Sequence, residues 1–130
     1  MIYRHWELVP ASVWSWSSFS PAEIACRHCG ELLLDLDFMD GLQDLRDLLG
    51  RPVHLTCAYR CAVHNARVGG APGSMHLKGR AADIALLRLP RAALAHAGLS
   101  AGFTGFGYYN TFLHVDTGRR RWWGNKEIWK

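Results

Sequence analysis

The 130-residue sequence contains no apolar run close to the roughly 20 residues that a membrane-spanning helix needs. Its first seven residues lack the basic start, apolar middle and small-residue cleavage site of a secretory signal. Internal repeats, low-complexity tracts and long linkers are absent as well. We therefore expect a single domain over residues 1–130 that is made in the cytoplasm and has no membrane partner.

Charged residues are too scarce for a disordered chain, at 20% of the sequence against 49% hydrophobic residues. The chain is expected to fold around one core. The formal net charge is +4, and part of the excess lies in the run Arg119–Arg121. A positive charge favours a polyanionic partner, but it does not distinguish nucleic acid from other anionic polymers.

Helix and strand signals alternate along the chain and predict an α+β fold, with helices packed on a small antiparallel sheet. The expected helices are residues 21–26, 37–49 and 90–97, the last closed by Gly98. The expected strands are residues 53–56, 81–87, 105–109 and 112–116, the last two as a hairpin, and residues 65–74 form a loop.

Residues 1–18 carry three tryptophans at irregular spacing, Trp6, Trp14 and Trp16. An aromatic-rich arm of this kind more often packs onto its own domain than forms a separate binding element. We expect residues 1–18 to be an N-terminal arm that packs on the rest of the chain.

The densest polar motif runs from Ser74 to Asp83 and is joined later by His114. Imidazole nitrogen and carboxylate oxygen are standard zinc ligands, and three protein ligands with an open fourth position are typical of a catalytic site. His76, Asp83 and His114 supply such a set. A single histidine is more simply a core or surface residue, so the spacing alone does not decide between the two interpretations.

Asp116 lies two residues after His114, so on a strand both side chains point to the same face. A zinc hydrolase needs a base close to its metal. Asp116 therefore has two candidate roles, as that base or as an acceptor that orients a ligand histidine.

The chemistry-bearing residues follow one pattern over most of the chain: Tyr-Arg, then Asn, then Ser-x-His-x-x-Gly-x-Ala-x-Asp, and finally His-x-Asp. This pattern resembles that of the D-Ala-D-Ala metallopeptidases, which share a fold with the hedgehog signalling domain. Thr117, Gly118 and the basic and tryptophan residues after them resemble a small branch of that family often carried by phages or prophages. The matching residues are Tyr59, Arg60, Asn65, Ser74, His76, Gly79, Ala81, Asp83, His114 and Asp116.

The resemblance implies a catalytic Zn²⁺ held by His76, Asp83 and His114. It also implies that Arg60 grips a substrate carboxylate or polarises its carbonyl, a role that suits the planar, permanently charged guanidinium. Ser74 would add a hydroxyl to the same substrate-binding point.

The sequence departs from the family pattern at the position of the base. Many relatives carry Glu or Asp three residues before the last ligand, or His two residues before it. Those positions here hold Thr111 and Phe112, and neither accepts a proton at neutral pH. Asp116 is therefore the candidate base by elimination and by strand geometry.

As a member of this family the chain would be a hydrolase, a zinc metallopeptidase that cleaves stem peptides or cross-links of peptidoglycan as a carboxypeptidase or endopeptidase. Without a secretory signal it fits a phage endolysin, released to the cell wall by another protein, or an enzyme exported by a non-classical route. The alternative is a non-catalytic, zinc-containing module that binds the wall. A nucleic-acid-binding zinc protein would leave the Ser74 to Asp83 motif unexplained, so we expect no nucleic-acid partner, and we expect a monomer.

Four cysteines form two close pairs, Cys26 with Cys29 and Cys57 with Cys61. Two such pairs suit a second, structural zinc, for which His28 could replace one thiolate. Disulfides and free buried thiols are the competing interpretations.

Several further side chains are candidates for the wall of the cleft. His64 lies close to Arg60 in the sequence and is the other histidine that could line it. The expected aromatic rim consists of Tyr108, Tyr109 and either Trp122 or Trp123.

Overall fold

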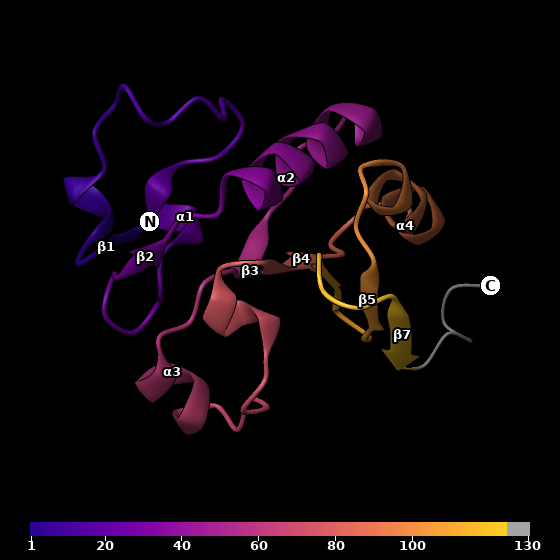
Figure 1. Cartoon of the computed structure of the whole chain (residues 1–130). Helices are drawn as coiled ribbons and strands as arrows, with labels where there is room; N and C mark the ends of the chain where they lie inside the picture. Colours follow the sequence, from indigo (N-terminus) through magenta and orange to yellow (C-terminus); the bar gives the residue numbers. More distant parts are fainter. Residues whose placement is uncertain (125–130) are drawn as a thin grey trace.

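Residues 1–124 are described by the computed structural model, and they contain a five-stranded sheet (Figure 1). Its strands lie in the order β3-β4-β6-β5-β7. Their bounds are β3 Leu55–Cys57, β4 Ala81–Ala85, β6 Phe112–Asp116, β5 Gly105–Tyr108 and β7 Arg121–Gly124. The antiparallel sheet is confirmed for the first four strands, whereas β7 was not expected and pairs parallel to β5.

The two central strands are paired over their whole length, from Ala81 opposite Asp116 to Ala85 opposite Phe112. Side chains alternate between the faces of a strand. Ile84 and Leu113 therefore point into the core, while Asp83 and His114 stand opposite each other on the other face. The alternation along β4 and β6 separates the apolar layer from the candidate site.

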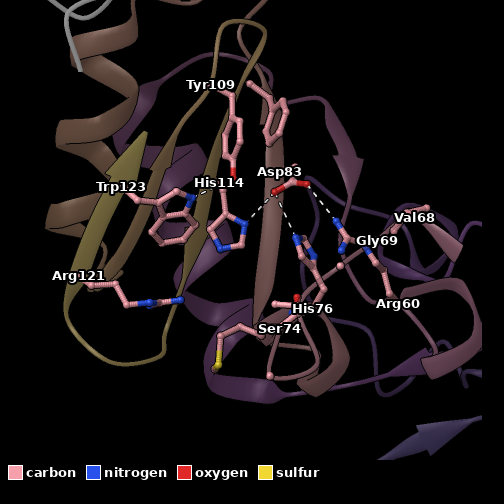
Figure 2. A pocket seen from close by; sticks show the side chains of 15 residues that line it. Arg60, Val68, Gly69, Ser74, His76, Asp83, Tyr109, His114, Arg121 and Trp123 are labelled. Carbon is pink, nitrogen blue, oxygen red and sulfur yellow. Dashed lines mark hydrogen bonds and ion pairs between the residues drawn. The ribbon is translucent and has the colours of Figure 1, made fainter. Parts of the chain in front are cut away.

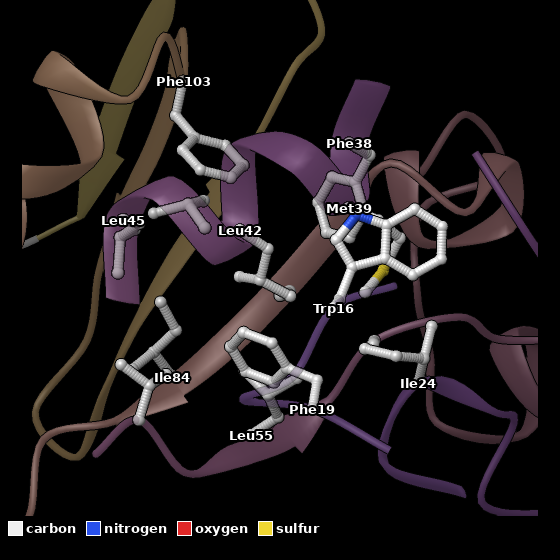
Figure 3. Close-up of a cluster of buried hydrophobic side chains, with 14 of the residues drawn as sticks. Trp16, Phe19, Ile24, Phe38, Met39, Leu42, Leu45, Leu55, Ile84 and Phe103 are labelled. Atoms are coloured by element: carbon white, nitrogen blue, oxygen red, sulfur yellow. The ribbon is translucent and has the colours of Figure 1, made fainter. Parts of the chain in front are cut away.

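Four α-helices lie in the described part of the chain: α1 Pro21–Ile24, α2 Leu36–Leu49, α3 Ala62–Arg67 and α4 Arg91–Ser100. The long helix α2 begins at Asp35, whose side chain accepts a hydrogen bond from the Phe38 amide, and it ends at Gly50. Its buried face carries Phe38, Met39, Leu42 and Leu45 against the sheet, with Ile84 and Leu55 opposite (Figure 3). Neither these helices nor any other in residues 1–124 is long and apolar enough to cross a membrane.

Several expected boundaries were wrong. The helix expected at residues 21–26 ends at Ile24, and the strands expected at 81–87 and 105–109 end at Ala85 and Tyr108. The strand expected at residues 53–56 begins at Leu55, and the expected loop at 65–74 begins inside α3, which Cys61 caps. Helix α4 does not stop at Gly98 but continues to Ser100, and the glycine that takes the left-handed backbone after it is Gly102.

The N-terminal arm contains a 3₁₀ turn, Trp6–Leu8, and the strand β1 Ile2–Tyr3, which pairs with β2 Leu32–Leu33 in a two-stranded sheet. Trp16 is only 5% exposed, packs in the core and donates from its indole to Asp40 at 2.8 Å. Trp6 and Trp14 are partly buried against the same core. Residues 125–130 lie outside the described part, so the single domain over residues 1–130 stays a prediction.

Gly79 ends the 3₁₀ turn Met75–Lys78 and turns the chain into β4. Its φ is 67°, and a Cβ atom there would lie 2.6 Å from the Leu33 carbonyl oxygen. Gly50 has a similar φ of 69° but no neighbour within 4 Å of such a Cβ. We expect Gly79→Ala to lower the free energy of unfolding by about 3 kcal/mol and Gly50→Ala by only about 1 kcal/mol.

Urea unfolding of the two variants beside wild type measures this difference. Because the backbone conformation is shared, equal losses would show that the contact with Leu33 does not constrain the turn.

Candidate metal centre

Three of the predicted site residues meet on the polar face of the sheet (Figure 2). Asp83 and His114 come from the central positions of β4 and β6, and His76 comes from the 3₁₀ turn Met75–Lys78. All three side chains are buried. His76 Nε2 lies 3.2 Å and His114 Nδ1 lies 2.9 Å from the same atom, Asp83 Oδ1. The ring nitrogens and the carboxylate thus converge on one point.

The far side of each imidazole ring is held by a further contact. His76 Nδ1 lies 2.5 Å from the Ala58 carbonyl oxygen, and His114 Nε2 lies 2.7 Å from Asp116 Oδ2. Such contacts fix the orientation and tautomer of a histidine ring. They leave His76 Nε2 and His114 Nδ1 as the nitrogens that face Asp83.

Asp116 is fully buried, with an exposed fraction of 0%, and both of its oxygens are occupied. Arg121 donates to Oδ1 at 2.8 Å and to Oδ2 at 2.7 Å, and the Gly118 amide donates to Oδ1 at 3.0 Å. Burial would raise the pKa of Asp116, but the hydrogen bonds from His114 and Arg121 hold that pKa well below its usual range. Of the two roles considered for Asp116, these contacts match the acceptor that orients His114.

The electrostatics of the centre favour an ionised carboxylate beside the imidazoles. Burial would lower the pKa of His76, but its hydrogen bonds with Asp83 and Cys57 raise that pKa to about 9. Burial would likewise raise the pKa of Asp83, but the hydrogen bonds from His114 and His76 bring it to about 2. An ionised carboxylate is therefore stable between the two rings.

A cavity of about 500 Å³ opens on this cluster. Arg60 and Ser74 line it together with His76, Asp83 and His114, as the sequence pattern predicted. The Arg60 guanidinium is held by three neighbours, at 3.7 Å from Asp83 Oδ2, 3.1 Å from Asn65 Oδ1 and 3.2 Å from Cys57 Sγ. The Ser74 hydroxyl accepts a hydrogen bond from the His76 amide and so caps the turn that carries this histidine.

The aromatic wall of the cavity differs in part from the expected rim. Tyr109 and Trp123 line the cavity, and the Trp123 indole donates to the Tyr109 hydroxyl at 2.9 Å. Trp122, by contrast, is 60% exposed and lies beside a different hollow together with Tyr108. Arg121, which also lines the cavity, was missed because it was read only as part of a basic run. Arg121 and Trp123 lie two residues apart on strand β7, so their side chains share a face of that strand.

The four cysteines do not form one group. Cys26, Cys29 and Cys61 have their sulfur atoms within 4.8 Å of one another. Cys57 instead lies in the metal centre, with Sγ at 3.8 Å from His76 Nδ1. His64 is not among the described residues that line the cavity, and its ring stacks on His28.

Cys57 gives the centre a second candidate ligand set, because its sulfur, His76 and Asp83 have ligand atoms within 4.8 Å of one another. Cys57 approaches Nδ1, the nitrogen already bound to the Ala58 carbonyl, and thus the edge of the ring away from Asp83. The set with His114 therefore fits a metal better. Its two imidazoles and one carboxylate, with outer contacts already in place, suit a zinc ion.

Three convergent donors beside an open polar cavity and an arginine are the arrangement of a metal-dependent hydrolase. Comparison with known proteins narrows this class. The family described as Peptidase M15 matches residues 17–116, and the chain belongs to that family.

Two relatives show what the family contains. The zinc D-Ala-D-Ala carboxypeptidase of Streptomyces albus G is 38% identical over 88 residues, which cover 63% of this chain and 34% of that protein. The peptidoglycan L,D-endopeptidase MepK of Escherichia coli K12 is 35% identical over 99 residues, which cover 69% of this chain and 54% of that protein. The matched region thus spans between a third and just over half of each relative.

Arg121 is the counter-ion of the buried Asp116 carboxylate. Among the described residues, the ion-pair partners of Asp116 are Arg121 and, when it is protonated, His114. Removing one partner of a buried ion pair leaves an uncompensated charge. Because the Arg121 side chain is 27% exposed, we expect Arg121→Ala to lower the free energy of unfolding by about 2 kcal/mol, less than for a fully buried pair.

Arg120→Ala is the matched control, because Arg120 is exposed and neighbours Arg121 on the chain. Its effect should stay within about 0.5 kcal/mol. Urea unfolding of the two metal-free variants measures the difference, and equal effects would contradict the assigned role of the Arg121–Asp116 pair.

Proposed function

We propose that this chain is a zinc-dependent peptidase that hydrolyses peptide bonds in peptidoglycan. The observation that carries the proposal is the convergence of His76 Nε2 and His114 Nδ1 on Asp83 at the floor of a cavity that also contains Arg60. These three side chains would hold the zinc. One relative described above is named for D-Ala-D-Ala and the other for peptidoglycan, and these names support the substrate class.

Each residue of the cavity has a part in this reaction. A bound zinc ion would act as a Lewis acid on the scissile carbonyl and make water a nucleophile at neutral pH. Arg60 offers a planar fork of donors to a substrate carboxylate or carbonyl, and its contacts with Asn65 and Asp83 hold that fork in place. The Tyr109 and Trp123 side chains bound the same cavity and limit the shape of the peptide that enters.

Asp116 acts in this proposal as a positioning residue through His114, and not directly on water. Asp83 is the only carboxylate among the described residues that line the cavity. The Asp116 carboxylate faces the outer nitrogen of His114, where it fixes the ring and raises its basicity toward a metal.

The two roles of Asp116 predict different results for Asp116→Asn. A positioning role predicts a zinc affinity about 10- to 100-fold weaker, with peptidase activity restored by excess zinc. A base would leave zinc affinity unchanged and reduce kcat by about 100- to 10,000-fold even at saturating zinc. Chelator competition and activity titrations with zinc measure both quantities, and the second pattern would restore Asp116 as the base.

The function itself is tested with purified peptidoglycan and a defined muropeptide mixture. We expect wild type to release peptide fragments detectable by mass spectrometry, and His76→Ala, Asp83→Ala and His114→Ala to release none while keeping their circular dichroism. The exposed His54 lies outside the centre, so His54→Ala should remain active. Cys57→Ser should remain active as well, and loss of its catalytic metal would favour the second ligand set.

The products also identify the bond that is cut. Loss of a terminal D-alanine indicates a carboxypeptidase, whereas separation of cross-linked muropeptides indicates an endopeptidase. Binding to the wall without any product would favour the alternative, a non-catalytic module of the same fold. Action on the wall after release by another protein, as in phage lysis, remains part of the proposal.

A further inference from the structure

The structure contains a second group of metal-binding side chains, outside the cavity. We propose that Cys26, Cys29 and Cys61 hold a thiophilic divalent cation of the zinc class as a structural centre. The three sulfur atoms come from two segments 32 residues or more apart in sequence and lie within 4.8 Å of one another. Zinc bound by thiolates has Zn–S distances of about 2.3 Å, so sulfurs around one ion lie within roughly 4 Å of each other.

The backbone around the sulfurs is arranged as it is around metal thiolates. The Cys61 amide donates to Cys26 Sγ at 3.5 Å, and the His64 amide donates to Cys61 Sγ at 3.4 Å. Amide donors of this kind stabilise negative charge on sulfur and orient the ligands of a metal. Cys61 is also the N-cap of the short helix α3, which fixes the position of its side chain.

A tight turn brings the first two cysteines together. The Cys26 carbonyl accepts a hydrogen bond from the Gly30 amide at 2.9 Å, and the Cys26 amide donates to the Glu31 carbonyl at 2.8 Å. Only two residues separate Cys26 from Cys29, a spacing that many zinc sites use because it lets both sulfurs reach one ion. The turn is therefore preformed and needs only Cys61 to complete three ligands.

Three thiolates leave one position of a tetrahedral site for a fourth ligand. The rings of His28 and His64 stack with their centroids 5.8 Å apart, one residue from Cys29 and three residues from Cys61. A water molecule, or one of these imidazoles after it reorients toward the sulfurs, would complete a tetrahedral site. Three thiols also argue against a disulfide as the full explanation, because one disulfide uses two sulfurs and leaves the third unpaired.

This centre would join the N-terminal region to the segment that carries Arg60. Cys61 follows Arg60 directly, and the preceding Tyr59 already binds the same region through Ile24 and Glu31, at 3.0 and 2.6 Å. A metal at the cysteines would hold the end of this segment from outside the cavity, which these cysteines do not line. It would thus stabilise the position of the Arg60 side chain without contacting substrate.

Metal content and Co²⁺ spectroscopy of the full chain, purified under reducing conditions, test the proposal. We expect Co²⁺-substituted wild type to show a near-ultraviolet thiolate-to-cobalt charge-transfer band, and Cys29→Ser to lose this band and one equivalent of metal. Cys29 is exposed, so its substitution should leave the fold intact. Cys57→Ser is the matched control and should keep the band.

His114→Ala separates this site from the proposed catalytic one. We expect it to lose peptidase activity and one equivalent of metal but to keep the thiolate band. A wild-type chain without the band, a Cys29→Ser variant with the metal content of wild type, or a native mass two protons below that of the reduced chain would each overturn the proposal. The last result would identify a disulfide instead.

Discussion

The pairing of β4 with β6 is the constraint on which the rest of the site depends. It places Asp83 opposite His114 and turns both away from the core that Ile84 and Leu113 help to fill. Apolar burial on one face thus fixes the strands that carry the polar groups on the other. The remaining donor, His76, lies on a separate short turn. Gly79 ends this turn and lets the chain continue into β4.

The polar groups on these two strands are held by successive layers of hydrogen bonds. The imidazoles contact Asp83 on the inside, while Ala58 and Asp116 hold them from the outside. Arg121 then neutralises Asp116, which is buried too deeply to be solvated. Each outer group restricts the one inside it, so a precise donor arrangement is obtained from ordinary hydrogen bonds and one ion pair.

The sequence indicated the three candidate donors through the Ser74 to Asp83 motif and the late histidine taken together, because the spacing of single residues does not separate a ligand from a core histidine. It also predicted α2, whose apolar spacing and terminal Gly50 are strong signals. It did not predict the partners of Asp116, since the parallel strand β7 and its Arg121 are brought there by pairing with β5, which no short pattern encodes. The separation of Cys57 from the other cysteines was likewise decided by tertiary structure.

Because side chains alternate along β4 and β6, each strand has one face in the core and one face in the candidate site, and the two faces are under different constraints. Substitutions at Ile84 or Leu113 can follow changes in the helices, while those at Asp83 or His114 act on the candidate metal centre. A substitution can therefore change the core face or the site face of a strand without changing the other. Deletion cannot, because losing one residue from either strand would exchange its two faces at once, sending a carboxylate or an imidazole into the hydrocarbon layer. We therefore expect homologous chains to vary in length in their loops and to keep the length of these two strands.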